Sequence, residues 1–170
     1  MTALPSATAL YETLEAGVRR RLQANDVAKP LVVGIHTGGA WLAQRLHHAL
    51  QLHEPLGTLD ISFYRDDVST SGLHPQVRPS NLPTAVDGRT VLLVDDVLHS
   101  GRTVRAALNE IFDYGRPDRV LLAVLVDRGD RDLPIAADIC ATRLDLPPGE
   151  HVKLRGPEPL ELELVMKTAS

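Results

Sequence analysis

The sequence is poor in features that would place it outside ordinary globular proteins. It contains one cysteine, Cys140, in 170 residues. A single thiol cannot form an internal disulfide, and no zinc-ligand spacing surrounds it. The sequence therefore excludes a disulfide-stabilised secreted fold and a structural zinc site, and it predicts a protein of the reducing cytoplasm.

Aromatic residues, long apolar runs and excess positive charge are also scarce. Aromatics make up 4% of the chain, so we expect a core of Leu, Val, Ile and Ala. No apolar run approaches the roughly 20 residues of a membrane span, and the first residues lack the pattern of a signal peptide. The net charge of −4 gives no whole-chain indication of nucleic-acid binding. We therefore expect no membrane partner, and a length that suits a single domain over residues 1–170.

The most informative stretch is residues 91–103, in which an apolar run is followed by Asp95 and Asp96 and then by a small polar turn. The pattern predicts a buried parallel strand, a turn and a helix that Ser100 or Thr103 caps. Open α/β sheets bind ligands at the carboxyl ends of strands, and helix N-termini attract anions. Carboxylates beside an anion site could bind the hydroxyl groups and the phosphate of a sugar phosphate. We favour this interpretation over a solvated turn that contains two Asp residues by chance.

A second strand–turn–helix pattern lies earlier in the chain. Residues 31–35 are apolar, a turn with Gly38 and Gly39 follows, and apolar residues then recur at helical spacing over residues 40–50. The glycines predict close approach of the backbone to a ligand. This turn alone is weak evidence for a ligand site. It gains weight because the same strand–turn–helix order recurs in the unit that contains Asp95 and Asp96.

The remaining segments complete an α/β pattern. We expect helices near residues 10–22 and 103–113, strands at 56–63 and 120–126, a shorter strand within 136–144, and solvated edge strands around 152–155 and 160–164. Residues 64–86 form a long irregular stretch, predicted as a mobile active-site loop rather than a disordered insertion. The predicted fold is a central, mainly parallel sheet flanked by helices, with a small hood.

The chain resembles the type I phosphoribosyltransferase superfamily through residues 91–103. More closely, it resembles the PyrR family of bifunctional pyrimidine-operon regulators and uracil phosphoribosyltransferases. Residues 34–39, 60–67, 101–108 and 125–129 carry this closer resemblance, which covers nearly the whole chain. It implies the type I phosphoribosyltransferase fold and transfer of phosphoribose from phosphoribosyl pyrophosphate to uracil, giving UMP and pyrophosphate.

The resemblance also implies a role for each site residue. Asp95 and Asp96 support the cationic sugar, and Arg65 on the mobile loop closes over the pyrophosphate. Phosphoribosyl pyrophosphate or nucleotide is bound by Thr37, Gly38, Gly39, Asp95, Asp96, Val97, Leu98, His99, Ser100, Gly101, Arg102 and Thr103. The base is bordered by Val126, Asp127 and Arg128. Mg²⁺ is held mainly through substrate and water, with Asp95 or Asp96 as the candidate protein contacts.

Three residues or segments depart from the family pattern. Gly38 stands where many relatives carry a basic residue, so the pyrophosphate loop lacks one cation. His99 replaces the Asp of hypoxanthine-type relatives and the Tyr of many PyrR relatives, which disfavours a purine substrate. Residues 130–138 carry acids and alanines where RNA-binding relatives are basic.

Two hypotheses remain, an enzyme and a UMP- or UTP-sensing regulator that attenuates transcription by binding pyr leader RNA with little catalysis. The acidic balance favours the enzyme, and transfer to another base is a weaker option. The family resemblance implies a homodimer or a higher homo-oligomer.

Overall fold

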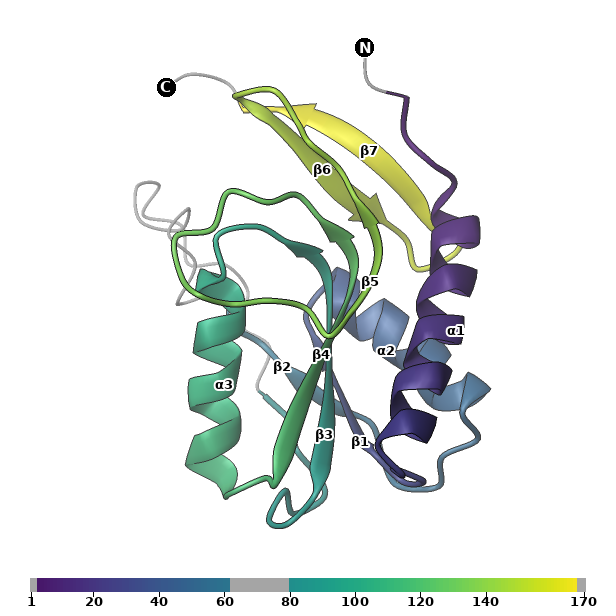
Figure 1. The fold of residues 1–170 in the computed structure, drawn as a ribbon, viewed down its shortest axis with the longest axis vertical. Helices are drawn as coiled ribbons and strands as arrows, with labels where there is room; N and C mark the ends of the chain where they lie inside the picture. The colour runs from purple at the N-terminus through teal and green to yellow at the C-terminus, as the bar shows by residue number, and fades with distance from the viewer. Residues whose placement is uncertain (1–2, 62–79, 168–170) are drawn as a thin grey trace.

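Parallel strands form the centre of the molecule (Figure 1). The computed structural model describes residues 3–61 and 80–167. Within them, the five-stranded sheet has the order β2-β1-β3-β4-β5, and every adjacent pair is parallel. The strands are β1 (Leu31–Ile35), β2 (Gly57–Leu59), β3 (Thr90–Leu98), β4 (Arg119–Asp127) and β5 (Ile139–Arg143).

Helices cover both faces of this sheet. Successive apolar side chains of its strands point to opposite faces, so each face needs a cover. Helices α1 (Ala7–Ala24) and α2 (Gly38–Ala49) pack on one face, and α3 (Arg102–Tyr114) packs on the other (Figure 1). In β3, Leu92 and Val94 join the core beneath α1 and α2, whereas Val91 and Leu93 join the core beneath α3. A strand buried on both faces needs the continuous apolar run seen in its sequence.

The hood is a separate hairpin. Strands β6 (Glu150–Arg155) and β7 (Glu161–Met166) pair antiparallel as a two-stranded sheet above the carboxyl ends of the central strands (Figure 1). The predicted alternation is present, because Val152 and Leu154 are buried and Lys153 and Arg155 are exposed. The predicted edge strands thus belong to their own small sheet.

Among the described residues of the predicted strand over residues 56–63, only Gly57–Leu59 form β2, and residues 62–63 lie outside the described residues. Strand β2 pairs with β1 as far as Ile35 and Leu59. The end of the predicted loop is tied to this strand: Asn81 exchanges backbone hydrogen bonds with Thr58, and Val86 is buried. The part of the predicted loop over residues 64–79 lies outside the described residues.

Candidate functional site

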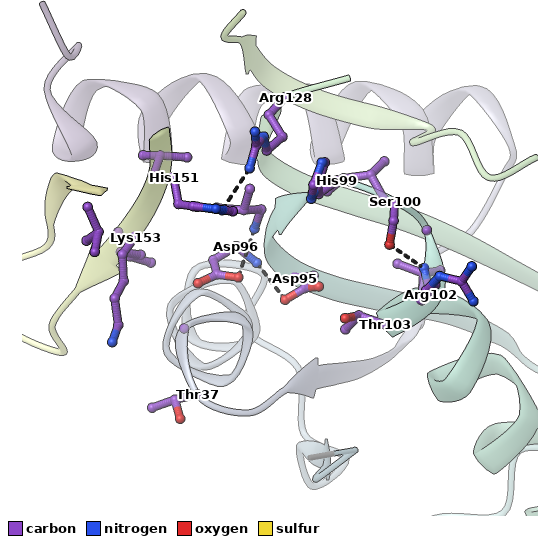
Figure 2. Close-up of a pocket in the computed structure, with 18 of the residues that line it drawn as sticks. Thr37, Asp95, Asp96, His99, Ser100, Arg102, Thr103, Arg128, His151 and Lys153 are labelled. Atoms are coloured by element: carbon purple, nitrogen blue, oxygen red, sulfur yellow. Dashed lines mark hydrogen bonds between the residues drawn. The ribbon is translucent and has the colours of Figure 1, made fainter. Parts of the chain in front are cut away.

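A cavity of about 900 Å³ lies between the carboxyl ends of the central strands and the hood (Figure 2). Its lining comes from the start of α2, from residues 95–104, from Arg128 and Asp132, and from β6 and β7. The lining contains five Arg or Lys side chains and three Asp side chains. The mixture suits a ligand that combines negatively charged groups with hydroxyl groups.

The adjacent carboxylates stand on the floor of this cavity. Asp95 is 3% exposed and pairs in register with Val124 of β4. The acid pair therefore belongs to the second half of β3 rather than to a loop. Asp95 Oδ1 accepts a hydrogen bond from the backbone of Asp96 at 2.9 Å, and Asp96 Oδ1 accepts from that of Val97 at 2.8 Å. Each carboxylate is therefore oriented by the backbone of the strand that carries it.

The turn after β3 leads directly into α3. Helix α3 begins at Arg102 with Gly101 as its N-cap, so the expectation that Ser100 or Thr103 occupies the cap is wrong. Gly101 has a φ of 93°, which strains any residue with a side chain, and a Cβ there would meet Ile135 tightly at 3.0 Å. Ser100 still contributes, because its Oγ accepts from the backbone N–H of Arg102 at 3.2 Å. The turn faces the cavity with the N-terminus of α3, where backbone N–H groups favour an anion.

Gly38 and Gly39 are the first two residues of α2, rather than a turn before it as the sequence predicts, and both pack tightly against β3. A Cβ on Gly38 would lie 2.9 Å from Cγ of Asp96, and a Cβ on Gly39 would lie 2.5 Å from the carbonyl oxygen of Val94. The two glycines thus let α2 start directly beside the acid pair. Close approach to β3, and not only to a ligand, requires them.

The segment after β4 supports the turn that starts α3 through several hydrogen bonds. Arg131 donates to the carbonyl oxygens of His99 at 2.9 Å and Ile135 at 2.8 Å, and to Asp127 Oδ2 at 2.7 Å. The carbonyl of Ser100 accepts from two further backbone N–H groups of this segment. The hydrogen bond from Arg131 lowers the pKa of Asp127, so this ion pair is intact at neutral pH.

The far end of the cavity is bordered by Arg128 and two imidazoles. Arg128 Nη1 lies 2.9 Å from Nδ1 of His151, and the rings of His99 and His151 meet edge to face with centroids 6.4 Å apart (Figure 2). Burial, followed by the charge of Arg128, lowers the pKa of both histidines. Both rings are therefore neutral at physiological pH.

The structure brings most of the predicted site residues together. The predicted residues that line the cavity are Thr37, Gly38, Asp95, Asp96, Val97, Leu98, His99, Ser100, Gly101, Arg102, Thr103 and Arg128. Gly39, Val126 and Asp127 lie outside its lining. Gly39 packs on β3, Val126 is fully buried, and Asp127 is held by Arg131. Arg65 lies outside the described residues.

Sequence reasoning missed the contribution of the hood. His151, Lys153, Arg155 and Lys167 line the cavity together with Val152 and Leu154 of β6. Charged residues alternating with apolar ones along a strand are typical of a solvated face, so local pattern gave no signal. Only the packing of β6 against the end of β3 brings these residues to the site.

The described residues suit a metal ion held through the substrate. Residues 3–61 and 80–167 contain no group of three or more His, Cys, Asp or Glu side chains placed to hold a metal. Asp95 and Asp96 provide oxygen donors of the kind Mg²⁺ prefers, but two carboxylates do not form a dedicated cage. The donor set thus fits Mg²⁺ that keeps water and substrate oxygens as its main ligands.

The comparisons with known proteins agree with this geometry. Residues 5–152 match the model of the phosphoribosyl transferase domain. The bifunctional protein PyrR of Nitrosococcus oceani is 54% identical over 158 residues, which cover 92% of this chain and 89% of that protein. The bifunctional protein PyrR of Pseudomonas aeruginosa is 53% identical over 169 residues, or 99% of both chains. The chain belongs to the PyrR family.

Solved structures place this PyrR-family chain in the type I phosphoribosyltransferase fold. A hypoxanthine-guanine phosphoribosyltransferase of Bacillus anthracis gives a TM-score of 0.67 at 17% identity, covering 89% of this chain and 85% of that one. A hypoxanthine phosphoribosyltransferase of Trypanosoma cruzi gives 0.64 at 18% identity, covering 89% and 85%. At such identities the similarity concerns the fold. Within the described residues, no helix has the length and apolar character that a bilayer span requires.

Proposed function

We propose that the protein is a uracil phosphoribosyltransferase, which converts uracil and phosphoribosyl pyrophosphate to UMP and pyrophosphate. One observation carries the proposal: a single cavity joins the Asp95–Asp96 pair to the turn that starts α3. The pair offers acceptors for the two ribose hydroxyls, and the turn offers backbone donors for the 5′-phosphate. Membership of the PyrR family supports uracil as the base.

The residues act by electrostatics and positioning rather than by forming a bond to the sugar. Positive charge develops at the anomeric carbon as pyrophosphate departs, and Asp95 and Asp96 stabilise that charge from beneath. The backbone N–H groups at Thr37 and Gly38 face the departing pyrophosphate. In this proposal Arg65 closes over the same group and excludes water, which would otherwise attack the same carbon.

Mg²⁺ is the proposed cofactor. When bound, it neutralises charge on the pyrophosphate oxygens and favours their departure. The protein's part is to orient the ribose hydroxyls through Asp95 and Asp96. Removing the ion with a chelator should abolish UMP formation, and added Mg²⁺ should restore it.

The described residues after β4 favour the enzyme over an RNA-binding attenuator. Arg131 is turned inward onto Asp127 and two carbonyl groups, so it is not presented to an RNA phosphate. The exposed charges of this segment are Asp130, Asp132 and Asp138. Because phosphate contacts supply most non-specific RNA affinity, this surface is a poor one for RNA. The relatives are named bifunctional, so regulation of pyr expression in response to UMP or UTP is the second function to test.

A uracil assay tests the proposal. The purified protein with phosphoribosyl pyrophosphate and Mg²⁺ should convert uracil to UMP, measured by chromatography, and should give far less product with hypoxanthine. An absence of UMP at saturating substrate, with UMP still bound in calorimetry, would leave the nucleotide-sensing regulator. Tight and salt-sensitive binding of a pyr leader RNA that depends on UMP would establish the second function.

The assembly and location of the protein are proposals as well. We propose a homodimer or higher homo-oligomer in the cytoplasm, consistent with the family. Light scattering on the purified protein measures the first, and cell fractionation measures the second.

A further inference from the structure

The hydrogen bond between Arg128 and His151 joins the central sheet to the hood at one end of the cavity (Figure 2). Arg128 is 8% exposed, and its Nε has no partner among the described residues. The guanidinium is thus held in place by its contact with the imidazole, where Nη1 lies 2.9 Å from Nδ1. A buried cation with an unsatisfied donor is costly, and it persists where a site needs it.

This contact decides which nitrogen of His151 carries the proton. Arginine is a donor only, so Nδ1 of His151 must be the acceptor. A neutral imidazole that accepts at Nδ1 carries its hydrogen on Nε2. No described residue accepts from Nε2, and the ring lines the cavity. His151 therefore offers one N–H donor to whatever the cavity binds.

The surroundings keep His151 in this neutral form. Burial, the charge of Arg128 and the charge of Lys167 lower its pKa. His99 packs edge to face against it, and the pKa of His99 is itself lowered by burial and by Arg128. A second proton on His151 would place two cations in contact at Arg128.

We propose that His151 is a specificity-determining residue that donates its Nε2–H to the C4 carbonyl oxygen of uracil, which cytosine lacks, with Arg128 as the residue that positions it. The proposal rests on the function proposed above and goes beyond it by assigning the discrimination between uracil and cytosine to one side chain, His151. Uracil carries two carbonyl oxygens, whereas cytosine carries an amino group in place of one. A donor that faces an amino group loses its partner, which disfavours cytosine.

Equilibrium binding of UMP and CMP tests the assignment without requiring turnover. Calorimetry would compare the unaltered protein with His151→Phe, which keeps a ring and removes both nitrogens, and with His151→Gln, which keeps an N–H donor. His53→Phe is the matched control, because His53 is exposed and absent from the cavity lining.

His151→Phe should weaken UMP binding about 3- to 10-fold, the value of one neutral hydrogen bond, and leave CMP binding unchanged. His151→Gln should restore most of the preference for UMP, and His53→Phe should match the unaltered protein. Affinity for ribose 5-phosphate should be the same in all four proteins. An equal loss for UMP and CMP, a loss for ribose 5-phosphate, or an unchanged UMP preference in His151→Phe would overturn the assignment.

The two proposals fail in different ways. If the protein makes no UMP from uracil but His151→Phe still loses its preference for UMP, the catalytic function fails and the base contact stands. If UMP forms normally and the preference does not depend on His151, the reverse holds.

Discussion

The same substitution, glycine to alanine, should lower stability at one of two neighbouring glycines and lower activity at the other. A Cβ at position 39 would meet backbone, 2.5 Å from the oxygen of Val94 and 2.9 Å from Cα of Asp95. A Cβ at position 38 would meet the Asp96 side chain, with Cγ at 2.9 Å and Cβ at 3.0 Å. Backbone in the central strand cannot yield without moving α2, whereas rotation about the Cα–Cβ bond of Asp96 moves its carboxylate away and leaves only the tight Cβ contact at 3.0 Å. Gly39→Ala should therefore cost stability, and Gly38→Ala should cost activity.

The magnitudes follow from these contacts. Overpacking of this kind costs about 1–3 kcal/mol, and alanine returns up to about 1 kcal/mol through its helix preference. Because the Cβ of Gly39→Ala meets backbone at 2.5 Å, we take the upper end of that cost, a net loss of about 2 kcal/mol, which should lower Tm by about 4–8 °C at 2–4 °C per kcal/mol. Gly38→Ala would break the bond of about 0.5–1.5 kcal/mol between Asp96 and the backbone of Val97, which the helix preference largely offsets. Its Tm should change little, while kcat/KM falls about 100-fold because the carboxylate is misplaced.

Thermal unfolding and UMP formation would be measured on both variants. Gln44→Ala, an exposed position in α2, is the control and should change neither quantity. Equal Tm shifts in the two glycine variants would refute the distinction between backbone and side-chain contact. Full kcat/KM in Gly38→Ala would show that the position of Asp96 does not matter to the reaction.

Three further predictions concern charged groups in or beside the cavity. Asp95→Asn with Asp96→Asn should lower kcat/KM about 100-fold or more while circular dichroism stays unchanged, because both side chains stabilise developing charge. Arg131→Met should cost about 3 kcal/mol at pH 7 by stranding buried Asp127, measured by urea unfolding. Since the folded pKa of Asp127 is depressed, its stabilisation is present above pH of about 4 and is lost below it, so the variant should lose less stability on acidification. His151→Gln should also lose less stability than the unaltered protein between pH 7.5 and 5.5, because a lowered histidine pKa lets the unfolded state bind the proton first.

Each of these predictions has an outcome that contradicts it. Activity that survives in the double Asp variant would remove both carboxylates from the mechanism. Arg143→Met is the control for Arg131, because the Arg143 side chain is 80% exposed and its contact with Asp127 is longer, at 3.7 Å. An equal loss of unfolding free energy in the two variants would show that Arg131 is not the main partner of Asp127. Parallel pH profiles for His151→Gln and the unaltered protein would place the pKa of His151 at its ordinary value.

The centre of the sheet was predictable because most residues of β1, β3 and β4 are buried. A continuous apolar run such as the one before Asp95 is typical of a strand covered on both faces, and β3 is such a strand. Strand β4 extends the predicted residues 120–126 by one residue at each end. The short β2 was not predictable in length, because its pairing stops where β1 stops. The N-cap at Gly101 depends on a positive φ and on contact with Ile135, and neither is visible in local sequence.

Asp95, Asp96 and the turn that starts α3 could be found from the sequence because they follow one another in the chain. Arg131 looked like one charge among several in a solvated loop, and only the fold reveals that it faces Asp127 and the carbonyl of His99. The hood residues are separated from the acid pair by the whole of α3, β4 and β5. No periodicity links His151 to Arg128, so their contact had to come from tertiary structure.

The hood consists of the last two strands of the described chain, and this has a consequence for biosynthesis. During synthesis, β1–β5 and the turn that starts α3 leave the ribosome before β6 and β7, so until the hairpin emerges the chain carries only the part of the cavity outside the hood. In the proposed function the nucleotide touches both parts, so it would bind the chain that carries the hairpin more tightly and stabilise the hairpin by mass action.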